Sequence, residues 1–312
     1  MTTKSQPHNI IVRKIPFAFD EDIEPIWHKQ QPEWSHMMNG ASMTMPYLEP
    51  FLIRSVREAM SQIDDPALLE DARAFNAQEG QHYQNHRRFN DLLKASGYPE
   101  LAQIEEEMEA DYARIQKKSL RWRLAYTAGF ETMTMGITEW LICNRSKLFS
   151  GADPRVVSFV LWHMVEETEH KTVAFDVYQH LYKSYWARVW GIVCGSMHVV
   201  KFSRKSYVPM LKKDGYWRSW RSRLTTFKRA SNFMWHVGKM LLLSMMPGHH
   251  PARVSDPEWV ADWMHAYQDL PEDRIPLLDT SDPNIPAQFT YCLLYTSPSP
   301  RDQRGSRMPS SA

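Results

Sequence analysis

Two short strings, Glu79-Gly-Gln-His82 and Glu167-Thr-Glu-His170, constrain the fold of this chain more than any other feature. Each places a carboxylate and an imidazole three residues apart, which puts both side chains on one side of a helix. Two such pairs, together with one Glu on each of two further helices, can hold two metal ions inside a four-helix bundle. Glu49 precedes the first string and Glu131 lies between the two. The sequence therefore predicts a two-metal carboxylate centre within a helical bundle.

The spacing alone is weak support, because 19 Glu and 13 His in 312 residues produce about one such string by chance. A third string, Glu33-Trp-Ser-His36, has no long apolar period around it, and we attribute it to chance. The other two lie within stripes that advance by alternating steps of three and four residues, the pattern of an inward helix face. Around the first string the stripe is Ala72, Phe75, Glu79, His82, His86, Phe89 and Leu93.

Each expected ligand occupies a position where this period predicts an apolar side chain. Charged side chains are rarely buried without a partner, and metal ions supply the compensating charge. The predicted ligands are Glu49, Glu79, His82, Glu131, Glu167 and His170. His86, His163 and Glu166 are candidates for additional ligands or for groups that orient the ligands, and a hydrogen-bonded core histidine is the alternative for the two His. Carboxylate-rich ligands without a thiolate suit two divalent ions, with iron favoured and manganese or zinc as alternatives.

The apolar period and its breaks predict an all-α chain. Helices are expected over residues 46–63, 67–95, 119–148 and 155–183, with a solvated acidic helix near residues 105–118 in the connection between the two halves. Residues 1–45 are expected to be irregular, residues 46–185 to form the four-helix bundle, and residues 186–291 to form a C-terminal helical extension. The run from Cys292 to Asp302 resembles a translated sequencing-library adapter, so we expect residues 292–312 not to belong to the natural protein.

Four strings identify a resemblance: TMPYLEPFLIRSVREAM, FNAQEGQHYQNH, TAGFETMT and LWHMVEETEHKTVAFDVY. They resemble the predicted metal-dependent hydrolase family of the ferritin-like, di-iron carboxylate superfamily, over roughly residues 10–270. The resemblance implies a ferritin-like four-helix bundle and the same six metal ligands. It also implies a metal-dependent hydrolase, although that activity is itself a prediction in the family's description. An O2-activating di-iron oxygenase or oxidase and a non-enzymatic iron-binding protein remain the alternatives.

The C-terminal third combines apolar and basic segments. Residues 186–200 and 232–246 are apolar but shorter than the roughly 20 residues that span a bilayer. Residues 201–229 between them carry ten Lys or Arg and a single acid, Asp214. Three interpretations remain open: an element on an anionic membrane surface through residues 186–246, an ordinary helical subdomain with a basic outer face, and, least favoured, a nucleic-acid contact.

Composition narrows the partners and the compartment. The formal net charge is +1, which does not favour a nucleic-acid partner, and the substrate is expected to be small and apolar. Three Cys without a C-x-x-C spacing suit a reducing compartment, and the N-terminus has no apolar secretory core. The sequence therefore predicts a cytoplasmic protein, with membrane association left open.

Overall fold

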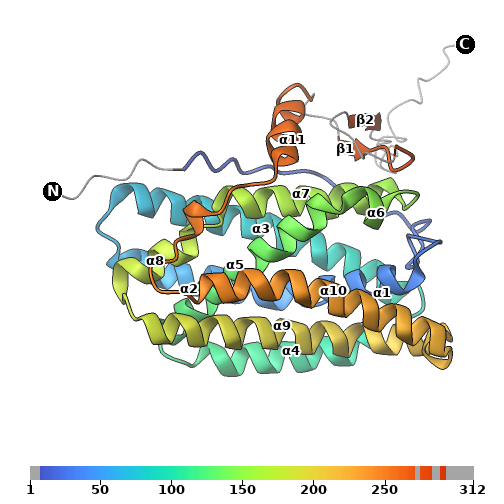
Figure 1. Cartoon of the computed structure of the whole chain (residues 1–312), viewed down its shortest axis with the longest axis horizontal. Coiled ribbons are helices and arrows are strands. Elements are labelled where there is room, and N and C mark those ends of the chain that lie inside the picture. Colours follow the sequence, from blue (N-terminus) through green and yellow to red (C-terminus); the bar gives the residue numbers. More distant parts are fainter. Residues whose placement is uncertain (1–7, 271–274, 283–288, 293–312) are drawn as a thin grey trace, which may run out of the picture.

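The structure is a computed structural model that describes residues 8–270, 275–282 and 289–292. These residues are mostly helical, which confirms the expectation of an all-α fold, and one short antiparallel strand pair accompanies the helices. Figure 1 shows most of the long helices running along the length of the molecule, with the strand pair and one short helix on top.

Four helices carry the expected ligands and enclose them: α2 (Met45–Ala59), α3 (Pro66–Ala95), α5 (Leu120–Cys143) and α7 (Pro154–His170). Their starts follow from local chemistry. The side chains of Asp65, Ser119 and Asp153 each accept a hydrogen bond from a backbone N–H in the first turn of α3, α5 and α7. Such caps satisfy donors that a helix start leaves without partners.

Two of the expected helices are broken. The helix expected over residues 155–183 ends at His170, and a separate helix α8 (Val173–Leu181) follows after Lys171 and Thr172. The helix expected over residues 119–148 ends at Cys143, and α6 (Arg145–Phe149) continues the chain. The helix expected over residues 46–63 ends in a single 3₁₀ turn, η1 (Met60–Gln62). The expected boundaries were therefore correct at the starts of these helices and less accurate at their ends.

The expectation that residues 1–45 are irregular was wrong in part, because α1 (Pro32–Ser42) is a helix. Packing against the long helix α9 (Tyr185–Lys213) stabilises it. At their contact, a Cβ added to Gly40 would lie 2.6 Å from the Ser203 backbone oxygen, so only glycine permits this approach. His36, from the string attributed to chance, is buried and lies 2.8 Å from an Asp214 carboxylate oxygen. It therefore has a structural role at a distance from the predicted ligands.

The acidic segment forms α4 (Leu101–Gln116), which is amphipathic rather than fully solvated. Leu101, Ile104, Met108, Tyr112 and Ile115 are buried, and most of its acids face solvent. The helix lies against α2 and α9. The prediction of a helix here was correct, and the prediction of a wholly solvated one was wrong.

The C-terminal third forms two long helices, α9 and α10 (Trp220–Ser244), joined by a 3₁₀ turn η2 (Tyr216–Arg218). Both pack on α5, so they cover the ligand-bearing helices from one side. The approach of α9 to α5 depends on Gly191, because an added Cβ would clash with the Ala125 carbonyl. No helix in the described part of the chain is long and apolar enough to cross a membrane.

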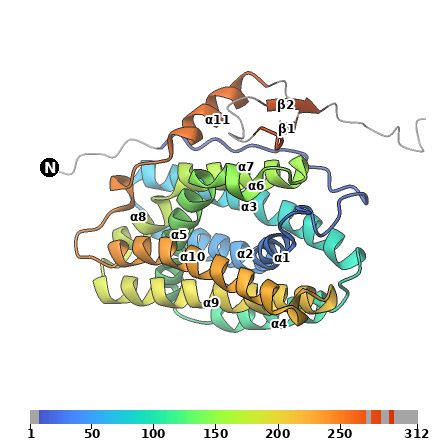
Figure 2. The ribbon, with the colours of Figure 1, turned by 45° about the vertical axis from the view of Figure 1, so that its right-hand side comes forward.

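Three of the remaining elements lie over α7, on the side away from α9 (Figures 1 and 2). They are α11 (Glu258–Gln268), β1 (Ile275–Leu278) and β2 (Phe289–Cys292), and the 3₁₀ turn η3 (Pro251–Arg253) precedes them in the chain. The strands pair antiparallel, with Ile275 opposite Cys292. Apart from Cys292, the tail expected over residues 292–312 lies outside the described residues.

Candidate metal centre

The six predicted ligands converge in the interior, together with His163. Their ligand atoms form two groups, and within each group the atoms lie within 4.8 Å of one another. One group is Glu49, His82 and His163, and the other is Glu79, Glu131, Glu167 and His170. Every member is buried, and they come from α2, α3, α5 and α7. Of the candidates for additional roles, His163 joins a group, whereas His86 and Glu166 lie behind other members.

Seven atoms of this cluster are buried without a hydrogen-bond partner among the described residues. They are both carboxylate oxygens of Glu49, Glu79 and Glu131, and Nδ1 of His82. Buried polar atoms in native proteins nearly always have a partner, because an unsatisfied one costs roughly 1–3 kcal/mol. Oxygen and imidazole nitrogen are the donors that iron, manganese and zinc accept in proteins. The donor set therefore fits divalent metal ions.

The pKa shifts of the carboxylates also fit a site for divalent metal ions. Burial raises the pKa of Glu49, Glu79 and Glu131 well above the ordinary value, and the nearby Glu167 carboxylate raises each further. Burial acts in the same direction on Glu167, but His170 and His163 outweigh it and hold the pKa of Glu167 well below its usual range. Burial lowers the pKa of His82 and His86 well below that of free histidine. Burial and a neighbouring carboxylate thus oppose the ionised form of three carboxyls in this cluster.

The imidazole of His82 is held from behind by Glu166. His82 Nε2 lies 3.0 Å from Oε2 of Glu166, which leaves Nδ1 facing the cluster, 3.7 Å from Oε1 of Glu167. Arg13 in turn lies 3.2 Å from Oε1 of Glu166 and forms two hydrogen bonds of 2.7 Å to Glu169. Burial raises the pKa of Glu166 to about 8, although Arg13 opposes this shift. Glu166 therefore orients a predicted ligand.

His170 is held in a similar way by an amide. Its Nδ1 lies 2.8 Å from Oε1 of Gln78, so this nitrogen donates and Nε2 faces the carboxylates. Nε2 is 3.0 Å from Oε2 of Glu167 and 3.4 Å from Oε1 of Glu79. Gln78 also donates to the backbone oxygen of Ile11, so the N-terminal segment supports both histidines.

A third buried chain of hydrogen bonds leads away from Glu167. Oε1 of Glu167 lies 2.7 Å from Nε2 of His163, and His163 Nδ1 lies 2.8 Å from Nε2 of His86. His86 Nδ1 contacts the Ser42 hydroxyl at 2.8 Å, and that hydroxyl donates to Asn90. The chain fixes the ring of His163 toward the cluster, as outer partners of metal-binding histidines do.

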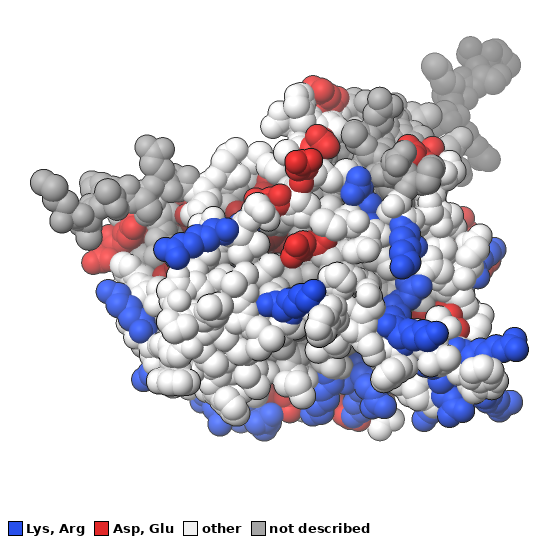
Figure 3. Space-filling view, viewed as in Figure 1, with Lys and Arg blue, Asp and Glu red and all other residues white. Residues whose placement is uncertain are grey.

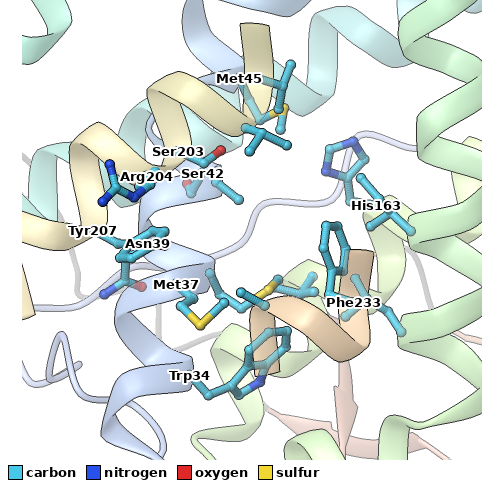
Figure 4. Close-up of a pocket in the computed structure, with 18 of the residues that line it drawn as sticks. Trp34, Met37, Asn39, Ser42, Met45, His163, Ser203, Arg204, Tyr207 and Phe233 are labelled. Atoms are coloured by element: carbon cyan, nitrogen blue, oxygen red, sulfur yellow. The ribbon is translucent and has the colours of Figure 1, made fainter. Parts of the chain in front are cut away.

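A cavity of about 430 Å³ reaches this cluster (Figure 4). Its inner end is lined by Glu167, His163, His86 and Ser42, and its walls are mainly apolar side chains of α1, α5, α7, α9 and α10. The volume falls within the range of roughly 300–1,000 Å³ of small-molecule sites. Phe130 and Phe89 line the cavity, and the ring of Phe75 packs edge-on against the ring of His170, with the two ring centroids 4.9 Å apart.

The sequence analysis missed Arg13 and Gln78, which hold the histidines in place. A signal for Arg13 existed in the sequence, because Ile11, Ile15 and Phe17 fall in one phase of a period of two and Arg13 shares that phase. A charged residue in the inward phase of such a pattern needs a buried partner. Gln78 gave no comparable signal.

The geometry agrees with the comparison against known families. A family model described as predicted metal-dependent hydrolase matches residues 11–255. The chain belongs to this family. The match covers every residue of the cluster and both helices of the C-terminal pair, α9 and α10. None of the curated proteins and none of the solved structures compared with the chain is significantly similar to it.

Proposed function

We propose that this member of the family is an enzyme with two divalent metal ions in a ferritin-like bundle of α2, α3, α5 and α7. One ion would be held by Glu79, Glu131, Glu167 and His170, and the other by Glu49, His82 and His163, with Glu167 close to both. The observation that carries the proposal is the set of seven buried atoms without a hydrogen-bond partner, all on these ligands.

Two divalent ions would supply either a water nucleophile for hydrolysis or electrons for the reduction of O2. The family's description favours hydrolysis. The surrounding residues contribute the rest. Glu166 and Gln78 keep the imidazoles of His82 and His170 in a fixed orientation, and the chain from His86 to Ser42 does the same for His163.

The second candidate, an O2-activating di-iron oxygenase or oxidase, is favoured by the character of the cavity. Its lining is mostly apolar and includes Phe130, Phe159, Met164 and Val160. An apolar substrate that reaches such a site presents C–H bonds to it. A purely iron-storing role is less supported, because storage has no use for an apolar cavity of this size.

Metal analysis of the purified protein tests the proposal. We expect about two ions of iron, manganese or zinc per chain by mass spectrometry, and about one fewer in each of Glu49→Gln and Glu79→Gln, which lie in different groups. Glu106→Gln, an exposed acid of α4, is the matched control and should keep both ions. The proposal would be refuted if the wild-type protein bound no iron, manganese or zinc after reconstitution.

Reaction of the reduced protein with O2 separates the two chemistries. Two ferrous ions that consume O2 and give a di-ferric absorption band would support the oxygenase or oxidase. Two zinc ions without O2 consumption, together with cleavage of a model ester, would support the hydrolase.

A further inference from the structure

The cavity has a second end, between α9 and α10. Arg204, Trp217, Arg223, Phe227 and Met234 line it there. Phe227 is 67% exposed and Met234 is 42% exposed, so this end opens at the surface. The two helices both pack on α5 but lie apart from each other along this stretch, and Figure 4 shows the open space between the α9 and α10 side chains. The cavity therefore joins the surface to the metal cluster.

The two ends differ in charge. At the surface end, the guanidinium groups of Arg204 and Arg223 form no ion pair or hydrogen bond within the described residues, and α9 and α10 contain no Asp or Glu. Between the ends the lining is almost wholly apolar, with Met37, Met133, Ile137 and Phe233 among the side chains. A ligand that fills the space must therefore be apolar along its length and negatively charged at its outer end.

We propose that the cavity binds a single aliphatic chain with an anionic head group, placed with the head at Arg204 and Arg223 and the chain directed toward His163 and Glu167. The inference rests on the second candidate function, the O2-activating oxygenase or oxidase, and names its class of substrate; the binding itself needs no metal ion. In this orientation the head group stays at the surface, so the bonds that face the cluster are those of the hydrocarbon chain.

Calorimetric titration with palmitate tests the proposal in wild-type protein and in the double variant Arg204→Gln/Arg223→Gln. We expect one palmitate per chain, bound about tenfold more tightly than the uncharged alcohol of the same length. The double variant should lose this preference while it still binds the alcohol, because both side chains are exposed and their loss leaves the apolar walls intact. Hexadecyl phosphate, with the same chain, shows whether the anion must be a carboxylate.

Obstruction of the cavity gives an independent measurement with a matched control. Ala230 lines the cavity, and its neighbour Ser231 is exposed on α10. Ala230→Trp should weaken palmitate binding at least tenfold, whereas Ser231→Trp should leave it unchanged. Palmitate binding that neither Ala230→Trp nor Arg204→Gln/Arg223→Gln alters would overturn the proposal, as would no binding at all.

Metal analysis of the same samples separates this inference from the proposed function. A protein that holds two ions but binds no palmitate would refute the substrate class and leave the metal centre standing. A protein that binds one palmitate per chain and holds no metal would refute the metal centre and leave the ligand class standing.

A different observation carries a second inference, about the outer surface of α9 and α10. Large apolar side chains are exposed along both helices, including Trp186 at 77%, Trp190 at 59%, Trp235 at 65% and Leu242 at 67%. Monomeric proteins rarely expose apolar side chains in such continuous rows. In Figure 3 this face is mostly uncharged, and Lys and Arg side chains border it.

The positive charge of α9 and α10 indicates which kind of partner this face binds. Together they carry eleven Lys or Arg and no acid, so a second copy of the same face would meet like charge. Exposed Trp beside Lys and Arg is typical of elements that lie in the headgroup region of anionic lipid. We infer that this face docks on an anionic membrane surface, which also presents the cavity mouth to lipid-derived chains.

Flotation with vesicles tests the docking. We expect the protein to float with phosphatidylglycerol vesicles at low salt and to remain below with phosphatidylcholine vesicles. Trp190→Ser/Trp235→Ser and Arg223→Glu/Lys228→Glu should each reduce the bound fraction about tenfold. The control Lys14→Glu/Arg73→Glu makes the same change of charge at exposed residues outside α9 and α10 and should bind as the wild type does. Equal flotation of all variants, or none with anionic vesicles, would refute the inference.

Discussion

Replacement of Glu131 by Gln should stabilise the metal-free protein and destabilise the metal-loaded one. The Glu131 side chain belongs to a residue that is 2% exposed, and neither of its carboxylate oxygens has a hydrogen-bond partner in the described structure. Burial and the neighbouring Glu167 raise its pKa well above the ordinary value. A group of this kind contributes its full stability below the unfolded pKa and loses it as the pH rises toward the folded pKa.

The size of the effect follows from that linkage. Each pH unit above the unfolded Glu pKa of about 4.3 costs the folded state up to about 1.4 kcal/mol. At about pH 7 the cost for one carboxyl therefore cannot exceed about 4 kcal/mol, and at about pH 5.5 it cannot exceed about 2 kcal/mol. Gln has the same shape and no charge to lose, so Glu131→Gln should recover up to these amounts when no metal is bound. With metal bound, the variant lacks a ligand and should be the less stable protein.

Urea unfolding of chelator-treated protein, followed by Trp fluorescence at about pH 5.5 and about pH 7, measures the difference. His82 and His86 have lowered pKa values, so their contribution is lost as the pH falls, but it cancels between variant and wild type. Glu106→Gln is the exposed control and should change neither curve. A Glu131→Gln protein that is less stable than the wild type at both pH values without metal would show that Glu131 already has a compensating charge, and the electrostatic reasoning would fail.

Two further predictions concern the support of the cluster and the packing of α9. Arg13→Met should lower the free energy of unfolding by about 3–5 kcal/mol, because it leaves the carboxylates of Glu166 and Glu169 buried without their cation. It should also weaken metal binding about 10–100-fold, measured by competition with a chelator, and unchanged metal affinity would contradict the support assigned to Glu166. Gly191→Ala should cost about 1–3 kcal/mol in thermal unfolding, since the new Cβ would meet the backbone of α5. Gly238→Ala on α10 has open space around it and should stabilise by about 0.5–1 kcal/mol, so equal effects of the two substitutions would refute the packing argument.

The helical period was enough to predict which side chains face inward. Four carboxylates occupy positions where the helical period predicts apolar residues, and all four are buried in the structure: Glu49, Glu79, Glu131 and Glu167. The same period could not predict the break after His170 or the helix α1, because contacts with distant segments decide both. Local propensity is a weak preference that tertiary packing readily overrides.

The choice among candidate ligands depended on the tertiary structure. The sequence spacing does not distinguish His86, His163 and Glu166 as ligands. The fold places His163 beside Glu49, and it directs Glu166 toward Arg13, which is 153 residues away in the chain. The cavity is also a product of the fold, because its two ends come from α7 and from the separated α9 and α10. Periodicity specifies the face of a helix from local geometry, whereas the partner of a buried charge is set by how distant helices pack, which no local pattern contains.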